Sequence, residues 1–299
     1  AQLKLLHDGF CGGYSAGLTM CNSQSVAELK KVSESDTAIV YENEKKHKIT
    51  VQRENDGDVV FVSTCFENNG DKPAVLEMLA SFAMKGVEAD TIYRMQSFWS
   101  AEGKLKKESI YDLHLESSWC GHGFRVEKFG NIGSMPVRKY FPFLVLENRK
   151  TGEFVGVQLY SPSSWQMELI CGRGPGLEVV GGIADRDFGQ WKKTVQPGES
   201  FTTPKAAIAF GNSIYDVCDK LVKAQKPDIS PLDCQMGIMF NEYCTTWGNP
   251  TLENIKNICD KLKDKGLQYF VMDSGWYGDS EYWWTCVGDW DINRTKFPD

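Results

Sequence analysis

The sequence predicts a multidomain protein with β and α/β structure, in which a large N-terminal antiparallel β-sandwich precedes a strand–helix–strand unit. Short apolar runs separated by turn residues recur over the first 230 residues, and KPDISPLD (226–233) then brings two prolines. Beyond it, a helical pattern lies between two apolar runs, as expected for parallel strands joined by a helix. A change of pattern at a proline-containing stretch is typical of a domain boundary. We therefore predict domains at 1–230 and 231–299.

The sandwich is predicted from short apolar or alternating runs that end at turn residues. Glycines at 57 and 152 close Asn-Asp-Gly and Lys-Thr-Gly turns, where a positive φ favours glycine. Many short strands at this spacing are typical of an antiparallel sandwich. The predicted strands are DTAIVYE (36–42), HKITVQRE (47–54), DVVFVSTCFEN (58–68), YFPFLVLEN (140–148), EFVGVQLYS (153–161) and WQMELICG (165–172).

Two helices follow from apolar residues that recur at helical spacing. The first covers 212–225, with Asn212 or Ser213 as its N-cap. The second covers 252–266, where lysines in the last turn and a final glycine are typical of a helix C-terminus. It lies between buried strands predicted at 235–240 and 267–273, so these two strands should be parallel.

The composition argues against several classes of protein. The 299 residues carry a net charge of −7, whereas nucleic-acid binding favours a basic surface. No apolar span of 18 residues predicts a membrane helix, and AQLKLLHDGF at the start does not resemble a signal peptide. None of the ten cysteines forms a CxxC pair, so we expect no zinc site. Cys65 and Cys259 lie in apolar runs and are expected to be buried thiols, which favours a cytoplasmic location; secretion after signal removal stays open.

Polar and aromatic residues follow both predicted parallel strands. Asn241 and Tyr243 come after the first strand, and Asp273, Ser274 and Trp276 come after the second. Ligands bind at the carboxyl ends of parallel strands, so these side chains are expected to converge. Carboxylates and amides bind hydroxyl groups, and aromatic rings pack on the apolar faces of sugars. The convergence therefore predicts a sugar-binding site.

Structural roles compete with this interpretation. An acid after a strand is often a helix cap or a turn residue, and the aromatic residues would serve equally well in a core. We expect Glu242 to be a polar wall of the pocket or a partner in a salt bridge. A tryptophan-rich loop at 278–299, which contains Trp290, is predicted both to wall the pocket and to be held in place by its own aromatic rings.

Three long motifs resemble the opening of the catalytic barrel in glycoside hydrolase family 36, the bacterial α-galactosidases. They are MFNEYCTTWGNPT (239–251), YFVMDSGWYGDSEYWW (269–284) and VGDWDINRTKFPD (287–299). The first half of the chain resembles the sandwich of the same family in MQSFWSAEGKL (95–105), YFPFLVLE (140–147) and WKKTVQPGESFTTP (191–204). The resemblance covers nearly the whole chain.

The resemblance implies that the second domain, 231–299, contains the first strands of a (β/α)₈ TIM barrel, which is incomplete in this chain. It implies retaining hydrolysis of terminal α-D-galactosyl residues by two carboxylates, with no metal or organic cofactor. It also implies a homo-oligomer formed through the sandwich. The substrate-binding residues that it implies are Asp273, Tyr243, Asn241, Trp276, Ser274 and Trp290, of which Trp290 is equally suited to a structural role.

Two departures from the family pattern matter. The nucleophile and the acid/base of the family lie on later strands, so we assign no catalytic residue in this chain and expect it to be inactive by itself. Ser274 replaces a second aspartate, which favours α-N-acetylgalactosaminidase or α-galactosaminidase activity as an alternative. A non-catalytic carbohydrate-binding or assembly module is a further alternative.

Overall fold

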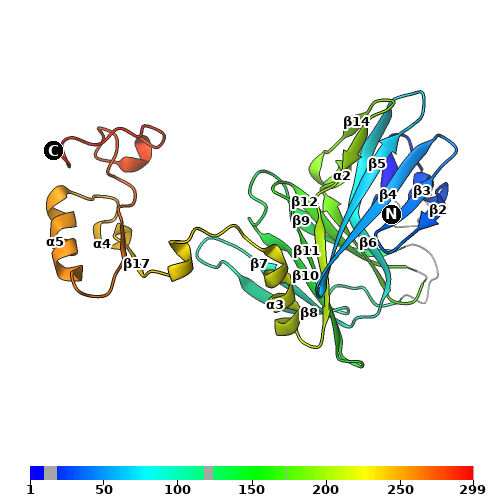
Figure 1. Cartoon of the computed structure of the whole chain (residues 1–299), viewed down its shortest axis with the longest axis horizontal. Coiled ribbons are helices and arrows are strands. Elements are labelled where there is room, and N and C mark those ends of the chain that lie inside the picture. The colour runs from blue at the N-terminus through cyan, green and yellow to red at the C-terminus, as the bar shows by residue number, and fades with distance from the viewer. Residues whose placement is uncertain (10–18, 118–123, 173, 299) are drawn as a thin grey trace. The chain divides into compact units, whose positions relative to one another are not determined.

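The computed structural model describes residues 1–9, 19–117, 124–172 and 174–298, which form two compact units, Ala1–Lys226 and Pro227–Asp299 (Figure 1). Cys11 and Cys120, two of the ten cysteines, and Asp299, the last residue of the third motif, lie outside the described residues. In those residues no helix is long and apolar enough to span a membrane.

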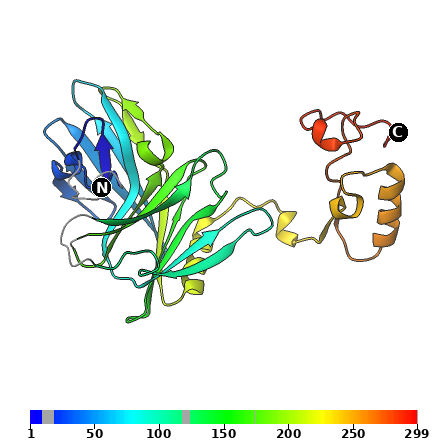
Figure 2. The same cartoon turned by 180° about the vertical axis from the view of Figure 1, so that it is seen from behind.

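Two antiparallel sheets build the first unit (Figures 1 and 2). The described part of one sheet has six strands, in the order β1 (Leu3–Leu5), β6 (Ala74–Val87), β13 (Leu177–Ile183), β12 (Trp165–Cys171) and β9 (Arg125–Asn131), with β14 (Lys193–Val195) also paired to β6. The other has ten described strands, in the order β2 (Lys30–Glu34), β3 (Ala38–Glu42), β4 (His47–Asp56), β5 (Val59–Asn68), β16 (Ala206–Gly211), β11 (Glu153–Leu159), β10 (Tyr140–Asn148), β7 (Thr91–Gln96) and β8 (Lys104–Ser109), with β15 (Ser200–Thr202) paired to β5.

The two sheets share one hydrophobic core, which makes the unit a sandwich. Trp165 and Met167 from the first sheet and Leu144 and Val157 from the second belong to the same buried cluster. All four side chains are fully buried. Burial of large apolar side chains from facing sheets is the main stabilising contribution in such a fold. The antiparallel sandwich expected from the sequence is therefore present.

Helix α3 (Ile214–Gln225) covers the outer face of the ten-stranded sheet, against β11 and β16 (Figure 1). Ser213 is its N-cap and accepts a hydrogen bond from the Asp216 amide, so the second of the two expected caps is the correct one. Gly156 on β11 allows the close approach of α3, because a Cβ atom there would lie 2.1 Å from Val217 Cγ1. The short helix α1 (Gln24–Ala27) lies between β1 of the six-stranded sheet and β2 of the other, and α2 (Arg186–Gly189) connects β13 to β14 within the six-stranded sheet.

The second unit contains a parallel pair, β17 (Met239–Asn241) and β18 (Tyr269–Val271), connected through helices α4 (Tyr243–Thr246) and α5 (Leu252–Leu262). Short 3₁₀ turns, η1 (Asp233–Gln235) and η2 (Trp283–Thr285), flank this core. Both strands are shorter than expected from the sequence, since residues 235 and 267 lie outside them. The prediction of buried strands is also wrong here, because Met239 is 59% exposed and Tyr269–Val271 is half-buried.

The C-terminal end of α5 also differs from its sequence pattern. Thr251 is the N-cap, so the helix begins at Leu252 as expected, but it ends at Leu262, four residues before Gly266. Cys259 is exposed and Cys65 is half-buried, so neither is the fully buried thiol expected from its apolar run.

Candidate functional site

The carboxyl ends of β17 and β18 bring Asn241 and Asp273 together. The strands pair Asn241 with Val271, two residues before Asp273. The Asn241 amide nitrogen donates to Asp273 Oδ2 over 2.7 Å. Parallel strands end at the same edge of a sheet, and for this reason residues 32 positions apart share one site.

Asp273 is held as an ionised acceptor. Its second oxygen, Oδ1, accepts hydrogen bonds from the Ser274 amide at 2.6 Å and from Ser274 Oγ at 3.1 Å. The hydrogen bond from Asn241 and the one from the Ser274 amide hold the pKa of the Asp273 carboxyl below its usual value. A carboxyl group with a lowered pKa is a poor proton donor near neutral pH. The geometry therefore suits Asp273 to accept hydrogen bonds from a ligand.

Ser274 supports its neighbour through both its backbone and its side chain. Because its hydroxyl donates to Asp273 Oδ1, Ser274 helps to orient the carboxylate that the sequence motif identifies. The hydroxyl oxygen keeps its lone pairs for a further donor.

Glu242 lies directly beneath this site and is fully buried. Its Oε1 accepts the backbone N–H of Asp273 at 3.1 Å, and its Oε2 accepts Thr246 Oγ1. Its own amide donates to Val271 O at 3.2 Å. The side chain forms no ion pair with any residue that the structure describes, and burial keeps it from lining an open pocket. Both roles expected for Glu242 are thus wrong; it ties the end of β17 to the end of β18.

The candidate aromatic residues of the site fall into two groups of ring contacts. Trp276 stacks on Trp290, with ring centroids 6.4 Å apart and an interplanar angle of 27°. Tyr243 belongs to the other group, where its ring meets the edges of Trp247 and Trp283 at 6.1 and 6.2 Å. Sequence reasoning placed Trp276, Trp290 and Tyr243 in one pocket, and the contacts join only the first two.

Trp247 was not among the candidate residues named from the sequence, and its ring lies beside that of Tyr243. It is 73% exposed and adopts a left-handed backbone with φ +53°. The signal available in the sequence was its position in TTWGNP, just after the first strand of the parallel pair.

The remaining motif residues fix the loop that carries Trp276. Gly275 has φ +102°, and a Cβ there would lie 2.0 Å from the Gly248 carbonyl oxygen. Lys296 Nζ donates to the Gly275 carbonyl oxygen over 2.9 Å. Asn293 is buried. Its backbone N–H donates to the Trp276 carbonyl oxygen, and its side-chain Oδ1 accepts a hydrogen bond from the Lys296 backbone N–H. These residues therefore have structural reasons for their place in the motif.

No group of three or more metal-ligating side chains occurs in the described part of the chain. What the site offers is an ionised carboxylate, an amide, a hydroxyl and exposed indole rings. These groups match the hydroxyls and the apolar face of a sugar ring.

Comparison with known proteins gives a consistent result. The Melibiase family model matches residues 200–299. α-Galactosidase Mel36A of Lactobacillus acidophilus is 26% identical over 284 residues, which cover 90% of this chain and 36% of the relative. α-Galactosidase AgaA of Geobacillus stearothermophilus is 26% identical over 81% of this chain and 32% of its own length. The chain thus spans about a third of the length of these curated relatives.

Solved structures share the fold. The GH36 α-galactosidase AgaB of Geobacillus stearothermophilus superposes with a TM-score of 0.71 at 18% identity, covering 100% of this chain and 40% of that one. AgaA of the same organism gives a TM-score of 0.71 at 18% identity, over 99% of this chain and 40% of its own. The family model and the relatives at 26% identity make the chain similar in sequence to part of the α-galactosidases of glycoside hydrolase family 36, and the solved structures show that it shares their fold.

Proposed function

We propose that the intact protein hydrolyses terminal α-D-galactosides of oligosaccharides or glycoconjugates with retention of configuration, and that Asp273 binds hydroxyl groups of the terminal sugar. The observation that carries the proposal is the Asp273 carboxylate at the end of β18, oriented by Asn241 and Ser274 and kept ionised by them. Its family relatives are named α-galactosidases, and variants of AgaA were solved in complex with raffinose and with stachyose.

The division of labour in this proposal follows from the chemistry. Retaining hydrolysis needs a nucleophilic carboxylate and an acid/base about 5 Å apart. Asp273 accepts three hydrogen bonds from neighbouring donors, keeps one acceptor position on Oδ2 and has a lowered pKa, which suits binding and not proton transfer. We therefore assign neither catalytic carboxylate to the described residues, and place both on strands that follow β18 in the intact protein.

The second unit is proposed to open a (β/α)₈ barrel. Its support is the parallel pair β17–β18 with α5 between the two strands, which is the repeating unit of such a barrel. Met239 on β17 and Ile238 beside it are 59% and 61% exposed. Apolar strand residues at this exposure favour further packing partners in the intact protein.

The location and assembly of the protein are also proposals. The eight described cysteines are unpaired thiols, which favours a reducing, cytoplasmic compartment. A homo-oligomer built through the sandwich is proposed from the family resemblance alone.

The substrate is tested with matched aryl glycosides. The intact protein, with its mass verified, is assayed with 4-nitrophenyl α-D-galactoside and with the corresponding N-acetyl-α-D-galactosaminide. We expect the galactoside to be cleaved faster. A higher kcat/KM for the N-acetyl sugar would favour the alternative based on Ser274, and no turnover of either sugar by the intact protein would favour a binding module.

A further inference from the structure

A continuous row of aromatic rings lies on the segments that follow β17 and β18. Neighbouring rings are in contact, with centroids 6.1, 6.2, 5.8 and 5.0 Å apart in order along the row. We call it the aromatic row, and its members are Trp247, Tyr243, Trp283, Trp284 and Tyr282. Because both segments start at the carboxyl ends of parallel strands, the row begins at the edge of the sheet where ligands bind.

The aromatic row is joined to the candidate sugar site through Tyr243. The Tyr243 backbone N–H donates to Asn241 Oδ1 at 2.9 Å. The same Asn241 side chain donates through Nδ2 to Asp273 Oδ2 at 2.7 Å. A sugar chain that binds through its terminal unit at Asp273 therefore starts beside the row.

The far part of the row is held in place by its own loop. A Cβ atom at Gly248 would lie 2.3 Å from Trp283 Nε1, so this glycine lets the indole pack closely on the segment after β17. The Thr285 backbone N–H and hydroxyl both donate to the Tyr282 carbonyl oxygen, at 3.0 and 2.7 Å, and the Cys286 amide donates to the Trp283 carbonyl oxygen at 3.1 Å. Aromatic rings fixed in this way lose little conformational entropy when a ligand binds.

The last two rings of the row are exposed and lie among acidic groups. Trp284 is 59% exposed and Tyr282 is 52% exposed, with their ring planes 37° apart. Ring faces pack on the apolar faces of sugars, and the indole N–H and the phenol O–H donate to hydroxyl groups. Glu281 and Asp289, in the same loop, are exposed carboxylates. A protein surface that covered this loop would take their charges out of water, and an anionic sugar would be repelled. A neutral sugar is the better match.

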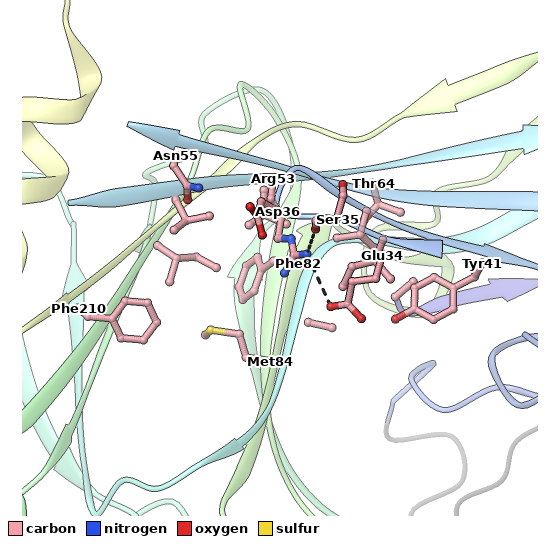
Figure 3. A pocket seen from close by; sticks show the side chains of 17 residues that line it. Glu34, Ser35, Asp36, Tyr41, Arg53, Asn55, Thr64, Phe82, Met84 and Phe210 are labelled. Atoms are coloured by element: carbon pink, nitrogen blue, oxygen red, sulfur yellow. Dashed lines mark hydrogen bonds and ion pairs between the residues drawn. The ribbon is translucent and has the colours of Figure 1, made fainter. Parts of the chain in front are cut away.

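A cleft in the first unit, of about 770 Å³, has a different chemistry (Figure 3). Val60, Val62 and Ile208 give one of its walls an aliphatic surface. Its Arg53 side chain is engaged within the protein, since it donates to the Ser35 carbonyl oxygen (Figure 3). Sugar hydroxyls placed against aliphatic walls would lose hydrogen bonds to water without replacing them. The aromatic row therefore suits a sugar chain better than this cleft does.

We propose that Trp284 and Tyr282 form a further sugar subsite, which binds units of a neutral oligosaccharide beyond its terminal galactose. The proposal rests on the proposed function, because it starts from a terminal sugar bound at Asp273. It adds a substrate class: an α-galactosyl oligosaccharide, in preference to a galactose attached to a small aglycone. Trp283 has a supporting role in it, since its ring lies between Tyr243 and Trp284.

Two substrates assayed with the intact protein separate this subsite from the site of the terminal sugar. Stachyose carries three further sugar units behind its terminal galactose, and 4-nitrophenyl α-D-galactoside carries none. We expect Trp284→Ala to lower kcat/KM for stachyose about tenfold, which corresponds to about 1.4 kcal/mol, and to leave the value for the aryl galactoside within about twofold. Trp284→Phe keeps a ring and should restore most of the activity on stachyose.

The control is Tyr215→Ala, at an aromatic residue of α3 that is 82% exposed, and it should change neither value. An unchanged kcat/KM for stachyose in Trp284→Ala would overturn the proposal. Equal losses on both substrates, with a lower melting temperature, would overturn it too, because the ring would then support the structure of the protein.

Failure of the proposed function gives a separate result. A wild-type protein that cleaves neither substrate refutes hydrolysis, and calorimetric titration with stachyose then tests the subsite directly. A Kd that is weaker in Trp284→Ala than in the wild type would support the sugar contact. Equal Kd values, or no binding by the wild type, would overturn it.

Discussion

Replacing Asp273 by Asn in the intact protein is expected to lower kcat/KM for an aryl α-galactoside about 10- to 150-fold. The carboxylate has about four acceptor positions. Asn241 Nδ2, the Ser274 amide and Ser274 Oγ occupy three of them, which leaves Oδ2 free to accept one sugar hydroxyl. A hydrogen bond to a charged group contributes about 1.5–3 kcal/mol, and about 1.4 kcal/mol corresponds to a factor of ten.

The asparagine variant keeps the shape of the side chain and changes its hydrogen-bonding character. All three neighbours of the Asp273 carboxylate are donors. An amide there must turn its own NH₂ group toward a donor or toward the sugar, so the loss arises in binding. Asp273→Ala removes the acceptor entirely and should cost more. Asp279→Asn, at an exposed acid in the same loop, is the matched control and should leave kcat/KM unchanged.

The assay is the initial rate of 4-nitrophenol release over a range of substrate concentrations, with circular dichroism melting to confirm that each variant is folded. Because the pKa of Asp273 lies below its usual value, the carboxylate stays ionised as pH falls toward 3.8. Binding through Asp273 should therefore not weaken between pH 7 and about pH 5. A value of kcat/KM for Asp273→Asn within threefold of the wild type would refute the assigned role.

Three further predictions concern the framework. Glu242→Ala leaves the partly buried N–H of Asp273 without its acceptor, and should lower the free energy of unfolding by about 1–3 kcal/mol and raise KM. Burial alone would raise the pKa of the Glu77 carboxyl, but hydrogen bonds from Lys4 and Arg186 outweigh burial and lower it. Glu77→Gln should therefore lower the free energy of unfolding by about 3–5 kcal/mol at pH 7. Gly156→Ala would place a methyl group 2.1 Å from Val217 Cγ1 and should cost about 1–3 kcal/mol. Urea denaturation measures all three, and kinetics measures KM.

Each of these predictions has a control. Glu242→Gln keeps a carbonyl oxygen that can accept the Asp273 backbone N–H, so its KM should stay close to that of the wild type. The cost of Glu77→Gln should shrink as pH falls below 4.5, because stability from a carboxyl with a lowered pKa is lost as pH falls through its folded-state value. Gly174→Ala adds a methyl group to open space and should be neutral. A pH-independent cost at Glu77, or equal costs at both glycines, would contradict the reasoning.

Local patterns in the sequence were sufficient to predict much of the sandwich. The strands expected at 140–148 and 153–161 correspond to β10 and β11, and the helix expected at 212–225 corresponds to α3. Strand β6 was missed because PAVLEMLASFAMKGV is a long apolar run without alternation, as expected of a strand covered on both faces. Its neighbours along the sheet, β1 and β13, are about 70 and 90 residues away in sequence, and no local pattern reports such pairing.

For the candidate site, the sequence determined which residues follow the parallel strands, since an apolar run that ends at Asp273 or Asn241 is a local feature. Only the tertiary structure decided how these residues are used. It brought Asn241 and Asp273 within hydrogen-bond distance, buried Glu242 beneath them, and separated Tyr243 from the stacked pair of Trp276 and Trp290. Hydrogen bonds and ring contacts depend on distances of a few ångströms between residues far apart in the chain, and such distances are set by packing, not by sequence order.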